Sequence, residues 1–201
     1  MAVAAASIRD AILNGKSIKQ LLRSQEQAQA KLVNSTASVP KEVKALSEIA
    51  GADALPLLYF ACWQSDPNNM RLLLSAGADV KASGDCSPVA LACANLGPKT
   101  LDCLAILKQH RADFAWCSSK TGIGALFMAC RESKEKKLQE QVVDFLVQSK
   151  ACPPDMPLQG AIVLGQMLLA QDGQFARLVP KFGVSFGGTT FAGLFISLLW
   201  S

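Results

Sequence analysis

The stretch Leu55–Lys81, LPLLYFACWQSDPNNMRLLLSAGADVK, decides the fold of this chain, because it predicts two short helices joined by a tight turn. Asp66 can accept a free backbone N–H at the start of the second helix, and Pro67 suits the first helical position. Gly77 suits the left-handed residue that ends a helix. Two helices this short cannot bury their apolar sides alone, so the unit needs similar units stacked on it.

Degenerate copies of this unit recur along the chain at intervals of roughly 33 residues, which is typical of solenoid proteins. Ala61-Cys62 returns as Ala92-Cys93 and as Ala129-Cys130, and a further small residue stands at Ala161. Each small residue precedes a second apolar helix with a short polar ending. Each also follows a signal for the start of a helix, at Leu55–Leu57, Ser87–Val89, Gly124–Leu126 and Met156–Leu158.

The pattern resembles the ankyrin repeat family over about residues 52–201. The family's Thr-Pro-Leu-His-x-Ala is matched in part by SPVALAC at Ser87–Cys93 and by MPLQGA at Met156–Ala161. Its Leu-Leu-x-x-Gly-Ala-Asp is matched by Leu73–Asp79 and more loosely by Leu107–Asp113. No copy keeps the family's histidine, which implies that these repeats are less regular than those of the family.

We therefore predict an all-α fold: an ankyrin-type solenoid of stacked helix-turn-helix repeats with an N-terminal helical cap. Residues 1–39 form the N-terminal helical extension or cap. Residues 40–201 form the ankyrin-like repeat domain, with about four degenerate repeats, the last of which can be incomplete.

The N-terminal region predicts helices on both sides of a linker. Ser7–Leu22 carries a broken apolar stripe, interrupted at Asn14-Gly15, where a turn between two helices is expected. Asn34–Pro40, NSTASVP, predicts the linker, because Ser, Thr and Asn favour turns and a proline disfavours helix at the residue before it. Lys41–Ile49 predicts a short helix that ends at Gly51-Ala52-Asp53.

Composition favours a folded body that binds no nucleic acid. Half of the 201 residues are apolar and 18% are charged, far from the profile of a disordered chain. The net charge is +4, and the densest basic run, Arg131–Lys137, is interleaved with glutamates. A nucleic-acid footprint needs a concentrated basic face with few acids.

The cysteines predict reduced thiols and no metal site. None of the seven is spaced as Cys-x-x-Cys, and His110 is the single histidine, so a zinc site has few ligands. An odd count without a secretory signal favours a reducing compartment, and we expect a cytoplasmic protein. Cys62, Cys93 and Cys130 share one repeat position, where cysteine serves as a small apolar filler.

The C-terminal stretch Phe182–Ser201 has twenty residues and no charge, which is long enough to span a hydrocarbon core of about 30 Å. Glycines and threonines dilute its first half, so that only Phe191–Trp200 is strongly apolar, and this length suits a buried helix better. Three alternatives stay open. Either the chain is a fragment, or the stretch pairs with another element, or Phe191–Trp200 enters a membrane.

No catalytic constellation is visible, since the one histidine falls in a turn and no base is placed beside a nucleophile. We predict no catalytic residues, no cofactor and no metal. The resemblance implies instead a protein-protein interaction module or adaptor, in which the inner helices and extended tips form a concave face. The candidate partner-binding residues are Tyr59, Trp63, Lys81, Asp85, Trp116 and Lys120.

Trp116 has two readings, as a partner anchor or as a residue packed against a neighbouring repeat. Two other functional classes remain. One is a tail-anchored membrane protein with cytosolic repeats, and the other is a regulatory fragment of a larger enzyme.

Overall fold

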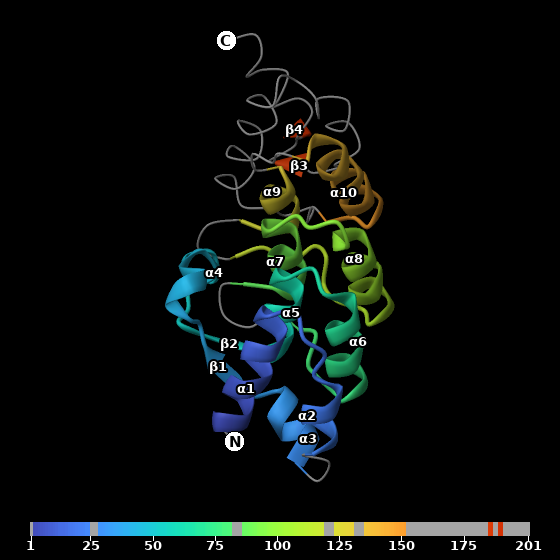
Figure 1. Ribbon diagram of the computed structural model, residues 1–201. Coiled ribbons are helices and arrows are strands. Elements are labelled where there is room, and N and C mark those ends of the chain that lie inside the picture. The colour runs from blue at the N-terminus through green and yellow to red at the C-terminus, as the bar shows by residue number, and fades with distance from the viewer. Residues whose placement is uncertain are drawn as a thin grey trace. The chain divides into compact units, whose positions relative to one another are not determined.

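The computed structural model describes residues 2–24, 28–81, 86–118, 123–130 and 135–151, together with two short strands at 185–186 and 189–190. These residues are mostly helical, which confirms the predicted all-α class (Figure 1). The chain divides into two compact units, Met1–Ala112 and Asp113–Ser201. The predicted N-terminal extension therefore belongs to the same unit as the first helix pairs.

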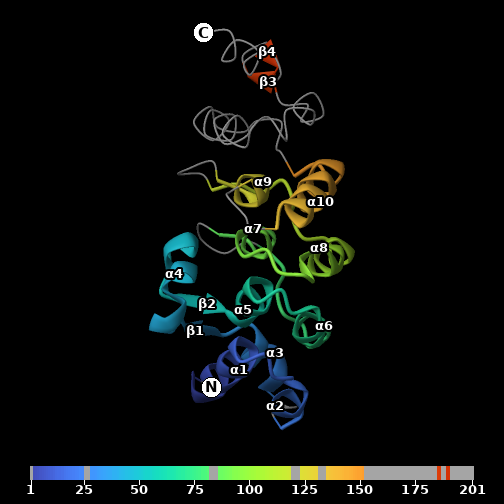
Figure 2. The ribbon, with the colours of Figure 1, turned by 45° about the horizontal axis from the view of Figure 1, so that its top comes forward.

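Three helices form the central row of the first unit (Figures 1 and 2). They are α1 (Ala2–Leu13), α5 (Leu57–Trp63) and α7 (Pro88–Ala94), and α5 contacts both of the others. A second layer lies beside this row. It contains α6 (Pro67–Ser75), which packs on α5, and α8 (Thr100–Gln109), which packs on α7 and on α6.

A small hairpin lies on the other side of the central row (Figure 2). Strand β1 (Thr36–Ser38) pairs antiparallel with β2 (Ala54–Pro56), so that Ala37 stands opposite Leu55. The prediction of a linker over Asn34–Pro40 was therefore wrong. The buried side chains of Ala37 and Leu55 favour pairing, because they place both strands against the core.

Between the two strands the chain forms the short 3-10 helix η2 (Lys41–Val43) and helix α4 (Lys44–Ala50). Gly51 ends α4 in the left-handed conformation, as the sequence indicates, and α4 contacts α7. The backbone N–H of Val39 donates to the Asp53 carbonyl at 2.7 Å. This hydrogen bond lies just beyond the paired residues of the two strands and closes the segment between them.

The N-terminal region contains two further short helices, α2 (Lys19–Arg23) and α3 (Gln29–Val33). The predicted interruption at Asn14-Gly15 is confirmed, because α1 ends at Leu13 and Gly15 has a φ of +66°. We call residues 16–34 the N-terminal arm, of which 25–27 lie outside the described residues.

Two consecutive helices form the described body of the second unit, α9 (Ala125–Ala129) and α10 (Lys136–Gln148). They pack together, and the Gln139 amide nitrogen donates to the Ala129 carbonyl at 2.9 Å. The rings of Phe114 and Phe145 lie 6.1 Å apart between centroids. Strands β3 (Ser185–Phe186) and β4 (Thr189–Thr190) pair antiparallel.

Local sequence signals start two of the helices as predicted. The Asp66 carboxylate accepts from the backbone N–H groups of Asn68 and Asn69 at 3.1 Å, and Pro67 occupies the first turn of α6. At the start of α7, the Ser87 hydroxyl accepts from the Ala90 N–H at 3.1 Å. Each cap satisfies backbone donors that the helix itself cannot satisfy.

The helices α6, α8 and α10 all end in the same way. Each is followed by a residue with positive φ, whose successor donates its N–H to a carbonyl of the last helical turn, which is the Schellman pattern. The residues with positive φ are Gly77 (90°), Arg111 (59°) and Lys150 (56°). The bonds are Ala78 to Leu73, Ala112 to Leu107 and Ala151 to Leu146, each 3.0 Å long.

Substitutions at two of these closures should shift stability in opposite directions. Gly77→Val is expected to lower the free energy of unfolding by about 1 kcal/mol or more, because a β-branched residue resists a left-handed backbone. A Cβ at Gly77 would meet no atom within 4 Å, so the cost is conformational rather than steric crowding. Arg111→Gly removes the same strain and should stabilise the protein by up to about 1 kcal/mol.

Urea denaturation measures both changes. Gly77→Asn is the control, because asparagine tolerates the left-handed region and should cost less than valine. Equal stability of the valine variant and the parent protein would contradict this account of the closure.

Candidate functional site

Tyr59 was predicted to contact a partner, but the structure places it in the core. Its side chain is 0% exposed, because α1, α6, α7 and β2 surround α5. Its hydroxyl lies 3.3 Å from the Cys86 carbonyl oxygen and 3.4 Å from that of Lys81. Tyr59 therefore contacts the backbone of Lys81 and Cys86 and is not available on a binding face.

The other predicted residues are distributed over both units, and two of them lie outside the described residues. Trp63 ends α5, is partly exposed, and accepts at its carbonyl from the Asn95 amide at 2.8 Å. Lys81 is exposed, and its N–H donates to the Asp79 carboxylate at 2.9 Å. Trp116 belongs to the second unit and is partly exposed. Asp85 and Lys120 lie outside the described residues.

The described parts of the chain contain no group of three or more His, Cys, Asp or Glu side chains that could hold a metal ion. His110 caps the end of α8, where it is exposed and its N–H donates to the Ile106 carbonyl at 3.1 Å. No helix within the described ranges is long and apolar enough to cross a bilayer. The predicted Phe191–Trp200 segment lies outside those ranges.

The thiols are mostly packed into the core. Cys62, Cys93 and Cys130 are 0% exposed, which confirms their prediction as core residues. Burial raises the pKa of Cys86, Cys103 and Cys130 to about 12, because the charged thiolate loses its hydration. The thiol form therefore dominates near neutral pH, and these cysteines are poor nucleophiles.

Thiol labelling of the native protein at pH 8 should therefore be selective. Cys117, the one partly exposed cysteine among the described residues, should react first, while Cys86 and Cys130 should react only after denaturation. Mass spectrometry after short exposure to iodoacetamide measures the order. Labelling of Cys130 as fast as that of Cys117 would contradict the packing.

The same pKa shifts predict how stability depends on pH. Unfolded thiols lose their protons near 9.0, whereas these buried thiols keep theirs to about 12. The unfolded state therefore binds fewer protons between these values, and the free energy of unfolding should fall as the pH rises from 9 to 12.

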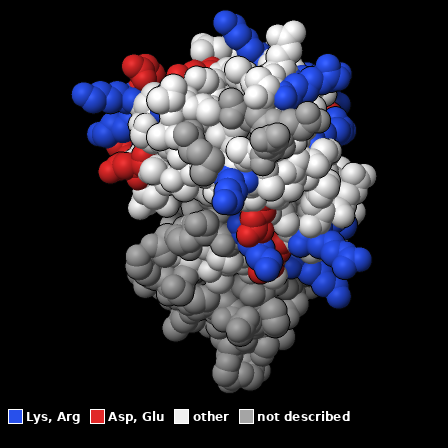
Figure 3. Space-filling model, turned by 90° about the horizontal axis from the view of Figure 1, so that it is seen from below, with Lys and Arg blue, Asp and Glu red and all other residues white. Residues whose placement is uncertain are grey.

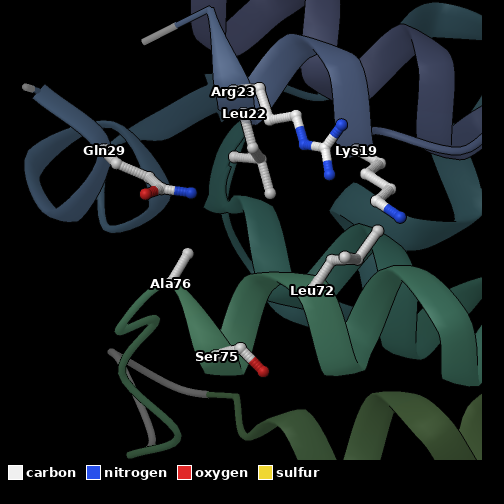
Figure 4. Close-up of a pocket in the computed structure, with 7 residues that line it drawn as sticks. All are labelled: Lys19, Leu22, Arg23, Gln29, Leu72, Ser75 and Ala76. Carbon is white, nitrogen blue, oxygen red and sulfur yellow. The ribbon is translucent and has the colours of Figure 1, made fainter. Parts of the chain in front are cut away.

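The described residues of the first unit form a hollow of about 210 Å³ where the N-terminal arm meets α6 (Figure 4). Leu22 of α2 and Leu72 of α6 point into it from opposite sides. Its lining is mainly apolar at the base, with cationic and amide groups at the side of the arm. The seven lining residues are Lys19, Leu22, Arg23, Gln29, Leu72, Ser75 and Ala76.

The buried side chain of Asn69 fixes one end of the arm to α6. Its Oδ1 accepts the Ile18 N–H at 3.1 Å, and its Nδ2 donates to the Lys16 carbonyl at 2.9 Å. The same Nδ2 donates to the Asp66 carboxylate at 2.7 Å. Asn69 is 1% exposed, so these partners replace water almost completely.

Asn34 fixes the other end of the arm to the closure of α6. Its Nδ2 donates to the Gly77 carbonyl at 2.8 Å, and its Oδ1 accepts the Asp79 N–H at 2.7 Å. The hollow therefore lies between two anchors, one before α2 and one after α3. Short helices that would not persist alone are held in place on both sides of it.

The hollow carries positive charge, and none of its described lining residues is a carboxylate. Lys19 and Arg23 are exposed and stand four residues apart on α2, and neither makes an ion pair within the described residues. Figure 3 shows Lys and Arg side chains spread over the face that it presents rather than gathered in one patch. The cations at the hollow are thus a local feature. Their combination with an apolar base suits a ligand that carries both an apolar group and an anion.

Few features of the sequence predict this hollow. The four-residue spacing of Lys19 and Arg23 on a short helix was the available signal, and it is common on solvated surfaces. The hollow forms because α2 and α3 lie beside α6, which comes some fifty residues later in the chain.

No protein-family model matches this chain, and comparisons with curated proteins and with solved structures find no match. Similarity to known proteins therefore adds no function to what its own residues indicate.

Proposed function

We propose that this chain is an ankyrin-like repeat module that binds another protein and carries out no chemistry of its own. The observation that supports this most is a recurring order of elements, which includes the closure of α6, α8 and α10 at a residue of positive φ. Each of these helices follows a shorter helix with a fully buried alanine, namely Ala61, Ala92 or Ala129. Equivalent positions with equivalent roles are what a repeat predicts.

Bonds between successive turns support a stiff binding surface in the first unit. The Ser65 hydroxyl lies 2.9 Å from the Thr100 hydroxyl, which joins the turn of one helix pair to the start of α8. The Asn95 side-chain amide donates a hydrogen bond to the Trp63 carbonyl, which joins the same two helix pairs. A surface already held in shape loses little conformational entropy when a partner binds.

Within this proposal, Trp63 and Lys81 are the best-supported contacts in the first unit. Trp63 offers a partly exposed aromatic side chain, a type enriched among binding hot spots, and Lys81 offers an exposed cation on the tip. Trp116 stays a candidate in the second unit. Asp85 and Lys120 stay predictions from the sequence. The reducing, cytoplasmic compartment also stays a prediction from the sequence.

The alternative of a tail-anchored protein depends on Phe191–Trp200, outside the described residues, and no observation favours it. No observation favours the other alternative, a regulatory fragment of a larger enzyme, either.

Site-specific photo-crosslinking tests the proposed function. A benzophenone amino acid replaces Trp63 or Lys81 in the full chain expressed in cells, and the matched control places it at Asp102, which is exposed on α8. We expect discrete adducts with one partner from the first two positions, competed by the untagged parent chain, and none from Asp102. Equal adducts at all three positions, or none at Trp63 and Lys81, would contradict the proposal.

A further inference from the structure

We propose that the hollow between the N-terminal arm and α6 binds an acidic peptide segment of a partner, with one aliphatic side chain inserted and a carboxylate on Lys19 and Arg23. This inference rests on the proposed function, since it assumes a protein partner. It adds a second contact, through residues other than Trp63 and Lys81, and it names the chemistry of that contact.

The size of the hollow favours a single side chain. Cavities of about 150 Å³ hold a benzene molecule, whereas sites for drug-sized ligands and cofactors occupy about 300–1,000 Å³. A volume of about 210 Å³ lies between these limits. It accommodates one leucine-sized or isoleucine-sized group and is smaller than the usual site of a cofactor. Leu22, Leu72 and Ala76 supply the apolar contacts that such a group needs (Figure 4).

The charges favour an acidic peptide over a neutral or basic one. Lys19 and Arg23 lie on the same side of α2, and a guanidinium can bind a carboxylate through two parallel hydrogen bonds. Among the described residues, no acidic side chain lines the hollow to compete for them. A bound aliphatic residue flanked by glutamate or aspartate would pack on the apolar lining of the hollow, and the flanking carboxylate would pair with the cations.

Polar groups opposite the cations suit the backbone of such a peptide. Gln29 of α3 can both donate and accept a hydrogen bond, and its amide reaches toward the hollow (Figure 4). Ser75 at the end of α6 offers a hydroxyl. These groups lie on walls that Asn69 and Asn34 hold in place, so binding does not have to order the arm.

A nucleic acid fits the same observations less well. Its backbone needs a track of cations, whereas the Lys and Arg side chains in Figure 3 are dispersed. The apolar contacts of Leu22 and Leu72 would also stay unused by a phosphate group.

Fluorescence polarisation with the full chain tests the proposal. The probe is a labelled eight-residue peptide of alternating glutamate and leucine, and the control peptide alternates lysine and leucine. We expect saturable binding of the acidic probe that weakens with added salt, and at least tenfold weaker binding of the lysine peptide. The double variant Lys19→Gln, Arg23→Gln should weaken binding of the acidic probe about tenfold, because two charge-assisted contacts are lost.

Lys31→Gln is the matched control, because Lys31 is an exposed cation of the same arm that does not line the hollow. It should leave the affinity unchanged, and unaltered thermal melting of both variants separates lost binding from lost folding. Amide NMR spectra should shift at Leu22 and Leu72 when the acidic probe is added.

Three outcomes would overturn the proposal: equal binding of the lysine peptide, equal weakening by Lys31→Gln, or no shift at Leu22 and Leu72 with millimolar probe. Tighter binding of a labelled oligothymidylate, with the same loss in the double variant, would overturn it in favour of a nucleic-acid site. Neither Trp63 nor Lys81 lines the hollow, so a failure here leaves the proposed function to be judged on the crosslinking experiment.

Discussion

The first unit depends most on the buried amide of Asn69. This one side chain accepts the N–H of Ile18 and donates both to the Lys16 carbonyl and to Asp66. Asp66 in turn caps the first turn of α6. Helix initiation and the docking of the N-terminal arm therefore share one network, and loss of the amide would leave the buried Ile18 N–H without its partner, at a cost of about 1–3 kcal/mol.

Asn34 gives the arm a second anchor, and the two anchors together explain why a hollow persists there. Helices α2 and α3 have five residues each, too few to be stable alone in water. Tethered at both ends, they stand over α6 without filling the space beneath them. Such a space costs contacts that a fully packed core would make. A bound side chain would restore those contacts, which connects the stability of the arm with the proposed binding of a peptide.

Local signals predicted much of this fold because they act within a few residues. The Asp66 and Ser87 caps, the Gly77 closure and the break at Gly15 all follow from the side chain at that position. The closures at Arg111 and Lys150 were harder to predict, since these residues adopt positive φ without the glycine that normally marks it. At these two positions the hydrogen bonds of the helix, including the final one, outweigh the preference of the residue for negative φ.

Pairings between distant segments were not visible in the sequence. Strands of three residues, such as β1 and β2, are too short to show alternation, so Asn34–Pro40 read as a linker. Tyr59 was predicted to bind a partner because inner helices form the binding face of the family that the sequence resembles, yet its ring is buried in the core and its hydroxyl lies near the backbone carbonyls of Lys81 and Cys86. The hollow and its two asparagine anchors also arise from such contacts, because asparagine by itself indicates only a turn.

Amide hydrogen exchange of Ile18 and Asp79 tests most directly whether the two asparagines hold the arm. Each of these N–H groups donates to an asparagine side-chain oxygen, so its protection reports that one contact. We expect both to exchange as slowly as the Met70 amide, which donates to the Asp66 carbonyl within the start of α6. Exchange of Ile18 and Asp79 at the rate of freely exposed amides, with Met70 still protected, would contradict the anchored arm.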